Sequence, residues 1–157
     1  MVEAKELGGL LKRIGNYDSQ LFEENFDQRL ILQKTVYLLQ AFGLFLGYRF
    51  NWYLRGPYSV EVARHGYELV DLFDKLPEAS FIEEKAEERF KIYLKFISEY
   101  QENAEMLEIL SSIHFIMKRA KNITNDQLFR VMRSKIVTID RKNIEIALNI
   151  LKGYELI

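Results

Sequence analysis

The sequence predicts a mainly α fold, a single-domain helical bundle over residues 1–157 with one short aromatic strand or hairpin and a winged-helix-like C-terminal part. Apolar residues recur at helical spacing through most of the chain, and only the segment around residues 48–55 alternates with the period of a strand. No repeat, low-complexity stretch or linker divides the sequence. A chain of 157 residues can bury one core without disulfides, and it contains no cysteine.

Two helices open the predicted bundle. Residues 4–14 place four leucine or isoleucine side chains at helical spacing, although Gly8 and Gly9 each weaken a helix by about 1 kcal/mol relative to alanine. Asp27 is a suitable N-cap for the next helix, and Gly43 is a suitable C-terminal stop. Because this second segment is apolar nearly all round, we expect it to be the central, buried helix.

The segment GYRFNWYLRG at residues 47–56 predicts the strand. Its apolar residues alternate with polar or charged ones, so one face should be buried. We expect Gly56 and Pro57 to form the turn that follows, and the C-terminal segment YELI is the candidate partner strand. The predicted buried face carries Tyr48, Phe50, Trp52 and Leu54.

Three further helices are marked by their first residues. Ser59 is a suitable cap for a helix through Phe73, and acidic residues near Glu83 favour the start of another. A long apolar-striped helix has Glu102 and Asn103 at its start. We expect this helix to lie antiparallel to the preceding one, with the connection near Gln101.

The part from Ala104 to Ile157 is winged-helix-like. Thr124 caps a short helix that ends near Ser134, and Asp140 caps another that ends before Gly153 and the apolar YELI. A helix, a short helix, a turn, a helix and an apolar strand follow one another in the helical part of a winged helix. We therefore expect that arrangement here.

Charge is distributed unevenly, although the net charge is only −1 at pH 7. Residues 74–108 contain ten acidic and five basic side chains, a net charge of −5. Residues 117–152 contain nine basic and three acidic side chains, a net charge of +6. The two regions should attract different partners. No segment has the apolar length of a membrane span, and the first residues lack the basic charge of an export signal, so we expect a cytoplasmic protein with no membrane partner.

We expect no catalytic residue, no metal and no cofactor. The two histidines, His65 and His114, do not form a metal-binding pattern, and no glycine-rich phosphate loop is present. We expect His65 to be a solvated helix residue and His114 to lie on or beside a helix face. An enzyme would need a pocket around His65, Tyr58 and Glu61, and it is the least favoured class of function.

The first candidate binding surface is the aromatic segment, and its expected partner is a protein. Tyrosine and arginine are typical of interface hot spots, because a rigid ring or a planar cation gains contact area at low entropy cost. A purely architectural role for the Gly-Pro pair is the alternative. The candidate residues are Tyr53, Arg55, Gly56, Pro57, Tyr58 and Arg64.

The second candidate surface belongs to a DNA-binding transcriptional regulator. The start of the last helix would read bases, and nearby basic residues would contact phosphates. The alternative is an ordinary basic helical surface. A homodimer is compatible with either function. The candidate residues are Arg130, Arg133, Lys135, Arg141, Lys142 and Asn143.

Two sequence motifs also resemble a known family. LQKTVYLLQ at residues 32–40 and FNWYLRGPYS at residues 50–59 are similar to motifs of the antitoxin-associated SocA-like proteins, also called the Panacea domain, and of their YwgA-type relatives. The matching residues are Leu32, Lys34, Tyr37, Trp52, Gly56 and Pro57.

The resemblance covers roughly residues 27–73. It implies a mainly helical, non-enzymatic module that binds another protein, such as a toxin or a client delivered to a protease. It also implies a characteristic surface formed by Lys34, Tyr53, Arg55, Gly56, Pro57 and Tyr58.

Overall fold

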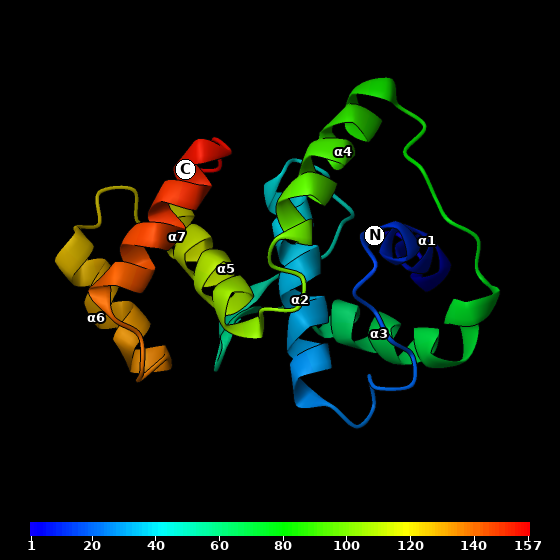
Figure 1. Ribbon diagram of the computed structural model, residues 1–157, viewed down its shortest axis with the longest axis horizontal. Coiled ribbons are helices and arrows are strands. Elements are labelled where there is room, and N and C mark those ends of the chain that lie inside the picture. The colour runs from blue at the N-terminus through cyan, green and yellow to red at the C-terminus, as the bar shows by residue number, and fades with distance from the viewer.

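The computed structural model describes residues 1–157 and contains seven α-helices, a short 3-10 helix and one antiparallel hairpin (Figure 1). This confirms the predicted mainly α single domain. No helix combines the length and the apolar character that crossing a bilayer requires. In chain order the elements are α1 (Ala4–Ile14), α2 (Phe26–Ala41), β1 (Asn51–Tyr53), β2 (Gly56–Tyr58), α3 (Val60–Leu72), η1 (Phe73–Lys75), α4 (Glu84–Ser98), α5 (Ala104–Arg119), α6 (Asn125–Lys135) and α7 (Arg141–Gly153).

Helix α2 lies near the centre of the molecule and separates two groups of helices. Figure 1 shows α1, α3 and α4 on one side and α5, α6 and α7 on the other. α2 packs against α3, α4 and α5, and α5 packs in turn against α6 and α7. Ten successive residues of α2, from Leu30 to Leu39, are buried. The predicted central, buried helix is therefore confirmed, and one continuous apolar cluster joins both groups.

Helices α4 and α5 do not form the antiparallel pair that their adjacency in sequence predicts. α4 packs against α1 and α2 instead. Arg13 of α1 pairs with Glu87 of α4 and lies over the ring of Phe90, 4.7 Å from its centroid. An ion pair and a cation–π contact thus join α4 to the N-terminal side of the molecule.

The start of α2 is set by a different cap from the predicted one. Asn25 Oδ1 accepts hydrogen bonds from the backbone N–H groups of Asp27 and Gln28, at 2.9 and 3.4 Å. The prediction of Asp27 as N-cap is wrong, because Asp27 lies in the first turn, where its charge favours the helix dipole. The caps of α3, α6 and α7 are the predicted residues Ser59, Thr124 and Asp140. α5 is capped by Asn103, one of the two residues expected at its start.

The predicted aromatic strand or hairpin is a hairpin, but its turn lies at other residues than predicted. β1 pairs with β2, and the two strands are joined by Leu54 and Arg55. Neither of these residues has a positive φ, whereas Gly56 follows them with a φ of 90°. A turn with negative φ followed by a left-handed glycine is a common way to close a short hairpin. The predicted Gly-Pro turn is therefore wrong, because Gly56 and Pro57 lie in β2.

The alternation of buried and exposed residues holds only as far as the turn. Tyr48 is buried, and Phe50 and Trp52 are half-buried against the core. Trp52 stacks on Phe115 of α5 with the ring centroids 5.5 Å apart. Leu54, predicted to be buried, is exposed because it occupies the turn.

The C-terminal part contains three helices but no wing. α6 and α7 both pack on α5, as the helical part of the prediction requires. After α7 the chain turns at Tyr154 and Glu155, and no strand follows. The predicted pairing of YELI with the aromatic strand is wrong, because Leu156 is buried in the core and β1 pairs with β2.

Gly66 marks a close approach between α3 and its neighbours. A Cβ there would lie 2.5 Å from Phe22 Cζ and 2.6 Å from Leu32 Cδ2. We predict that Gly66→Ala lowers the free energy of unfolding by about 1–3 kcal/mol, because overpacking outweighs the gain in helix propensity. Gly153→Ala is the matched control, since a Cβ there meets no atom within 4 Å. Denaturant unfolding measures both, and equal stability of the two variants would contradict tight packing at Gly66.

Candidate functional site

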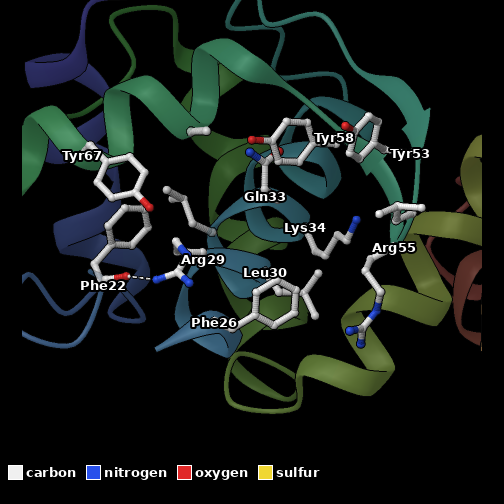
Figure 2. A pocket seen from close by; sticks show the side chains of 14 residues that line it. Phe22, Phe26, Arg29, Leu30, Gln33, Lys34, Tyr53, Arg55, Tyr58 and Tyr67 are labelled. Atoms are coloured by element: carbon white, nitrogen blue, oxygen red, sulfur yellow. Dashed lines mark hydrogen bonds between the residues drawn. The ribbon is translucent and has the colours of Figure 1, made fainter. Parts of the chain in front are cut away.

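One face of α2 forms the floor of a pocket. Five residues recur at positions i, i+3, i+4, i+7 and i+8, so they share one stripe of the helix. Figure 2 shows this stripe between α3 and the hairpin. The five residues are Phe26, Arg29, Leu30, Gln33 and Lys34.

Two polar side chains of this stripe hold the hairpin and the start of α3. Lys34 Nζ donates a hydrogen bond to the carbonyl oxygen of Pro57 at 2.7 Å. Gln33 accepts from the N–H of Ser59 at 2.9 Å and donates to the carbonyl of the same residue at 2.8 Å. Ser59 in turn caps α3 through a hydrogen bond from Val62 N–H. α2 thus fixes the segment that joins β2 to α3.

Gly56 lets the hairpin approach α5 and α2. Its φ of 90° is one that residues with side chains rarely adopt. A Cβ at this position would collide with Ser112 Oγ and would lie 3.4 Å from Lys34 Nζ. Both observations require glycine here, so its role in the hairpin is architectural.

Arg55 extends from the turn to α5. Its Nε and Nη2 donate to the two carboxylate oxygens of Glu108 at 2.7 and 2.9 Å, a bidentate pair. The carboxylate is buried, whereas the arginine side chain is about half exposed. The guanidinium also lies 5.5 Å from the ring centroid of Phe26. Arg55 therefore joins the hairpin to both α5 and α2.

These contacts enclose a pocket of about 280 Å³ between α2, α3 and the hairpin (Figure 2). Its lining is mostly hydrophobic and includes five aromatic side chains. It also includes three basic side chains and no acidic one. The pocket thus combines apolar surface with positive charge, and the basic residues are Arg29, Lys34 and Arg55.

Exposed apolar and aromatic side chains surround the mouth of the pocket. Phe26 is 52% exposed, Tyr53 59%, Leu54 72% and Tyr67 49%. Tyr53 stacks on Tyr58 across the hairpin with ring centroids 5.4 Å apart. These residues come from α2, the hairpin and α3, and together they form an apolar rim that no part of this chain covers.

Lys34 is the most unusual group of the pocket, because its side chain is only 1% exposed. Burial lowers the pKa of its amine to about 7, with a further lowering by Arg55 that Glu108 opposes. At neutral pH the charged and neutral forms of this amine are therefore both populated. Lys34 was expected on the surface from the resemblance, and that expectation is wrong.

The structure brings together most of the predicted aromatic site. Tyr53, Arg55, Gly56 and Tyr58 line the pocket, and Pro57 supplies the carbonyl that binds Lys34. The exception is Arg64, which lies outside the lining. Ala63 and Tyr67 are the residues of α3 that face the pocket, and the helical period turns position 64 away from them. Arg64 pairs instead with Glu68 at the surface.

Several pocket residues were missed from the sequence. Phe26, Arg29 and Gln33 share a helix face with Lys34, a residue of the resemblance motif. Their helical spacing is the signal in the sequence that indicates them. No local signal connects Arg55 with Glu108, which is 53 positions away in the chain. The missed residues of the lining include Phe26, Arg29, Gln33 and Tyr67, and Glu108 was missed as the partner of Arg55.

The two histidines lie outside this pocket. His65 is buried, and its Nδ1 lies 2.7 Å from the hydroxyl of Tyr48. The prediction of a solvated His65 is therefore wrong, because its side of α3 faces the core. His114 lies on the buried face of α5 with its Nδ1 2.7 Å from the hydroxyl of Tyr37, and burial lowers its pKa to about 4.

The predicted DNA-binding residues lie on α6 and α7, and part of this set has contacts within the chain. Arg141 pairs with Asp126 and lies 4.5 Å from the ring centroid of Phe129. Asn143 accepts a hydrogen bond from the N–H of Asp140 in a capping box. Lys135 is half-buried, with its amine 5.5 Å from the Trp52 ring. The exposed members of the set that make no ion pair are Arg130, Arg133 and Lys142.

The chain matches no family model, no curated protein and no solved structure.

Lys34 should make stability depend on pH. Its amine keeps its proton up to about pH 10.5 when unfolded but loses it near pH 7 when folded. The unfolded state therefore binds more protons between these values, and the free energy of unfolding rises with pH there. We predict that the free energy of unfolding of wild type, relative to that of Lys34→Met, increases by up to about 1.4 kcal/mol per pH unit from pH 7 to 10.

Denaturant unfolding of both proteins at several pH values measures this difference. Lys118→Met, at an exposed position on α5, is the matched control. A difference between wild type and Lys34→Met that stays constant over this range would show that Lys34 is charged in the folded protein.

Proposed function

We propose that the protein is a non-catalytic regulatory or adaptor module that binds a protein partner at the pocket between α2, α3 and the hairpin. The observation that carries the proposal is the exposed rim around this pocket, to which Phe26, Tyr53, Leu54 and Tyr67 contribute. An exposed apolar patch with a pocket at its centre is typical of protein-binding surfaces.

The rigidity of the hairpin supports this function. Lys34 and Gln33 hold its base from α2, and the Arg55–Glu108 pair holds its tip from α5. Tyr53 and Leu54 are therefore presented on a fixed support. A preorganised surface loses less conformational entropy when it binds.

The resemblance to the antitoxin-associated SocA-like family supports the same class of function. Its two motifs lie in different elements, α2 and the hairpin, and Lys34 of the first binds the carbonyl of Pro57 in the second, next to Gly56. We propose that these residues maintain the hairpin, and that Tyr53 and Leu54 face the partner. By this resemblance, the proposed partner is a toxin or a client protein.

Photo-crosslinking tests this function. We predict that p-benzoylphenylalanine in place of Leu54 crosslinks to a discrete protein in cells, because this side chain is exposed at the rim. The same amino acid in place of Phe45 is the matched control, since Phe45 is 76% exposed but follows the other end of α2. The recovered protein is then purified, and its affinity for the chain is measured.

Tyr53→Ala should weaken that affinity by about 30-fold, which corresponds to about 2 kcal/mol for a hot-spot side chain. Phe45→Ala should leave it unchanged. Tyr53 is a better choice than Arg55, because removing Arg55 leaves the buried Glu108 carboxylate without its partner. Equal crosslinking from positions 45 and 54, or an unchanged affinity of Tyr53→Ala, would count against the proposal.

We propose DNA binding as a second candidate function, on the observation that Arg130, Arg133 and Lys142 are exposed on α6 and α7. Fluorescence anisotropy with duplex DNA at several salt concentrations tests it. The slope of log affinity against log salt should become shallower by about 0.9 for each phosphate that a variant no longer neutralises. We predict that Arg130→Ala with Lys142→Ala neutralises about two phosphates fewer than wild type does. The absence of binding by wild type at low salt would exclude this function.

A further inference from the structure

We propose that the pocket between α2, α3 and the hairpin binds the C-terminal residue of a partner chain, with the apolar side chain inside the pocket and the terminal carboxylate at Lys34. This inference rests on the proposed protein-binding function and specifies its ligand. It follows from the charge of the pocket, from its size and from the hydrogen bonds of its basic residues.

The charge of the pocket favours an anion. Arg29, Lys34 and Arg55 line it without any acidic residue, and Figure 2 shows them in that order across it. Arg55 is neutralised by Glu108, but Arg29 has no such counterion. Its Nη1 donates to the carbonyl oxygens of Phe22 and Glu23, at 3.0 and 2.8 Å. Arg29 and the protonated form of Lys34 therefore supply net positive charge.

Lys34 also has spare hydrogen-bonding capacity. A lysine ammonium has three N–H donors, and Lys34 makes one hydrogen bond, to the Pro57 carbonyl. The side chain is 1% exposed, so bulk water does not surround the remaining donors. A carboxylate in the pocket would accept from them in a charge-assisted bond.

The size of the pocket selects a C-terminal residue over an internal acidic one. Its volume of about 280 Å³ lies at the lower end of the range for small-molecule sites, so it has room for one residue. The apolar side chains and the basic side chains line the same small pocket. The ligand must therefore carry its apolar side chain and its carboxylate close together, and in a C-terminal residue both are attached to one Cα.

Lys34 couples this binding to pH. Its pKa is about 7 in the free protein, and the charged groups that face it are Glu108 from α5 and Arg55 from the hairpin. A bound carboxylate adds a second negative charge beside the amine and raises its pKa above the value in the free protein. Binding therefore takes up a proton, and affinity should fall by up to tenfold per pH unit above pH 7.

The test is an NMR titration of the full chain, labelled at leucine methyl groups, with four small probes. N-acetyl-phenylalanine represents a C-terminal residue and N-acetyl-phenylalaninamide removes the charge. N-acetylglycine removes the side chain, and acetyl-Phe-Glu-amide carries an internal acid. We predict a dissociation constant on the order of 1 mM for N-acetyl-phenylalanine, with shifts at Leu30, Leu32 and Leu54, which line the pocket. The other three probes should bind at least about tenfold more weakly.

Variants and pH identify the group that binds the carboxylate. Lys34→Met should weaken N-acetyl-phenylalanine binding about tenfold or more, and Lys118→Met should not. If Lys34→Met fails to fold, the pH dependence of binding to wild type is the test. N-acetyl-phenylalanine should then bind about tenfold or more weakly at pH 8.5 than at pH 6.5.

Equal binding of the acid and the amide would overturn the proposal, and so would pH-independent binding or equal binding of acetyl-Phe-Glu-amide. Binding of no probe would overturn it as well. The crosslink from position 54 is independent of all these results. If it persists, only the assignment of the ligand fails and the protein-binding function stands.

Discussion

The burial of Lys34 between α2 and the hairpin is the constraint on which the candidate site depends. A pKa lowered from 10.5 to about 7 corresponds to about 5 kcal/mol of disfavour for the charged amine relative to the neutral one. An apolar side chain of similar length would not have this free-energy cost of burial. The amine also binds the Pro57 carbonyl, which would otherwise be a buried acceptor without a partner. The hairpin and α2 can therefore pack in few alternative ways.

The residues of the hairpin divide into two sets with different roles. Gly56 and Pro57 face α2 and α5, are buried and allow the close approach. Tyr53 and Leu54 point away from the core and are among the more exposed large side chains of the chain. Both sets lie in one short hairpin, which has three residues in each strand and a two-residue turn. The contacts that anchor this hairpin therefore also fix the position of its apolar tip. Arg55 is the intermediate case, since it is held by Glu108 and still reaches solvent.

The sequence predicts what depends on local interactions. α1 and the caps of three later helices, α3, α6 and α7, follow from residue type and spacing. Asn25 and Asp27 are difficult to distinguish because both are good caps two positions apart. Apart from the Asp27 cap and the position of the hairpin turn, with Leu54 in it, the main errors concern contacts between distant segments. The partner of β1, the packing of α4 against α1 and the Arg55–Glu108 pair all depend on tertiary arrangement. The aromatic part of the candidate site could be predicted because its residues lie close together in one short segment of the sequence.

Charge is also distributed unevenly around α2. Its pocket-facing stripe contains Arg29 and Lys34, and Arg55 of the hairpin lies beside it. Asp27, on another face of the same helix, lines an open polar groove with Glu99, Glu102 and Glu105. The exposed basic residues of α6 and α7 lie on the far side of α5 from α2 (Figure 1). The two candidate functions therefore use separate surfaces.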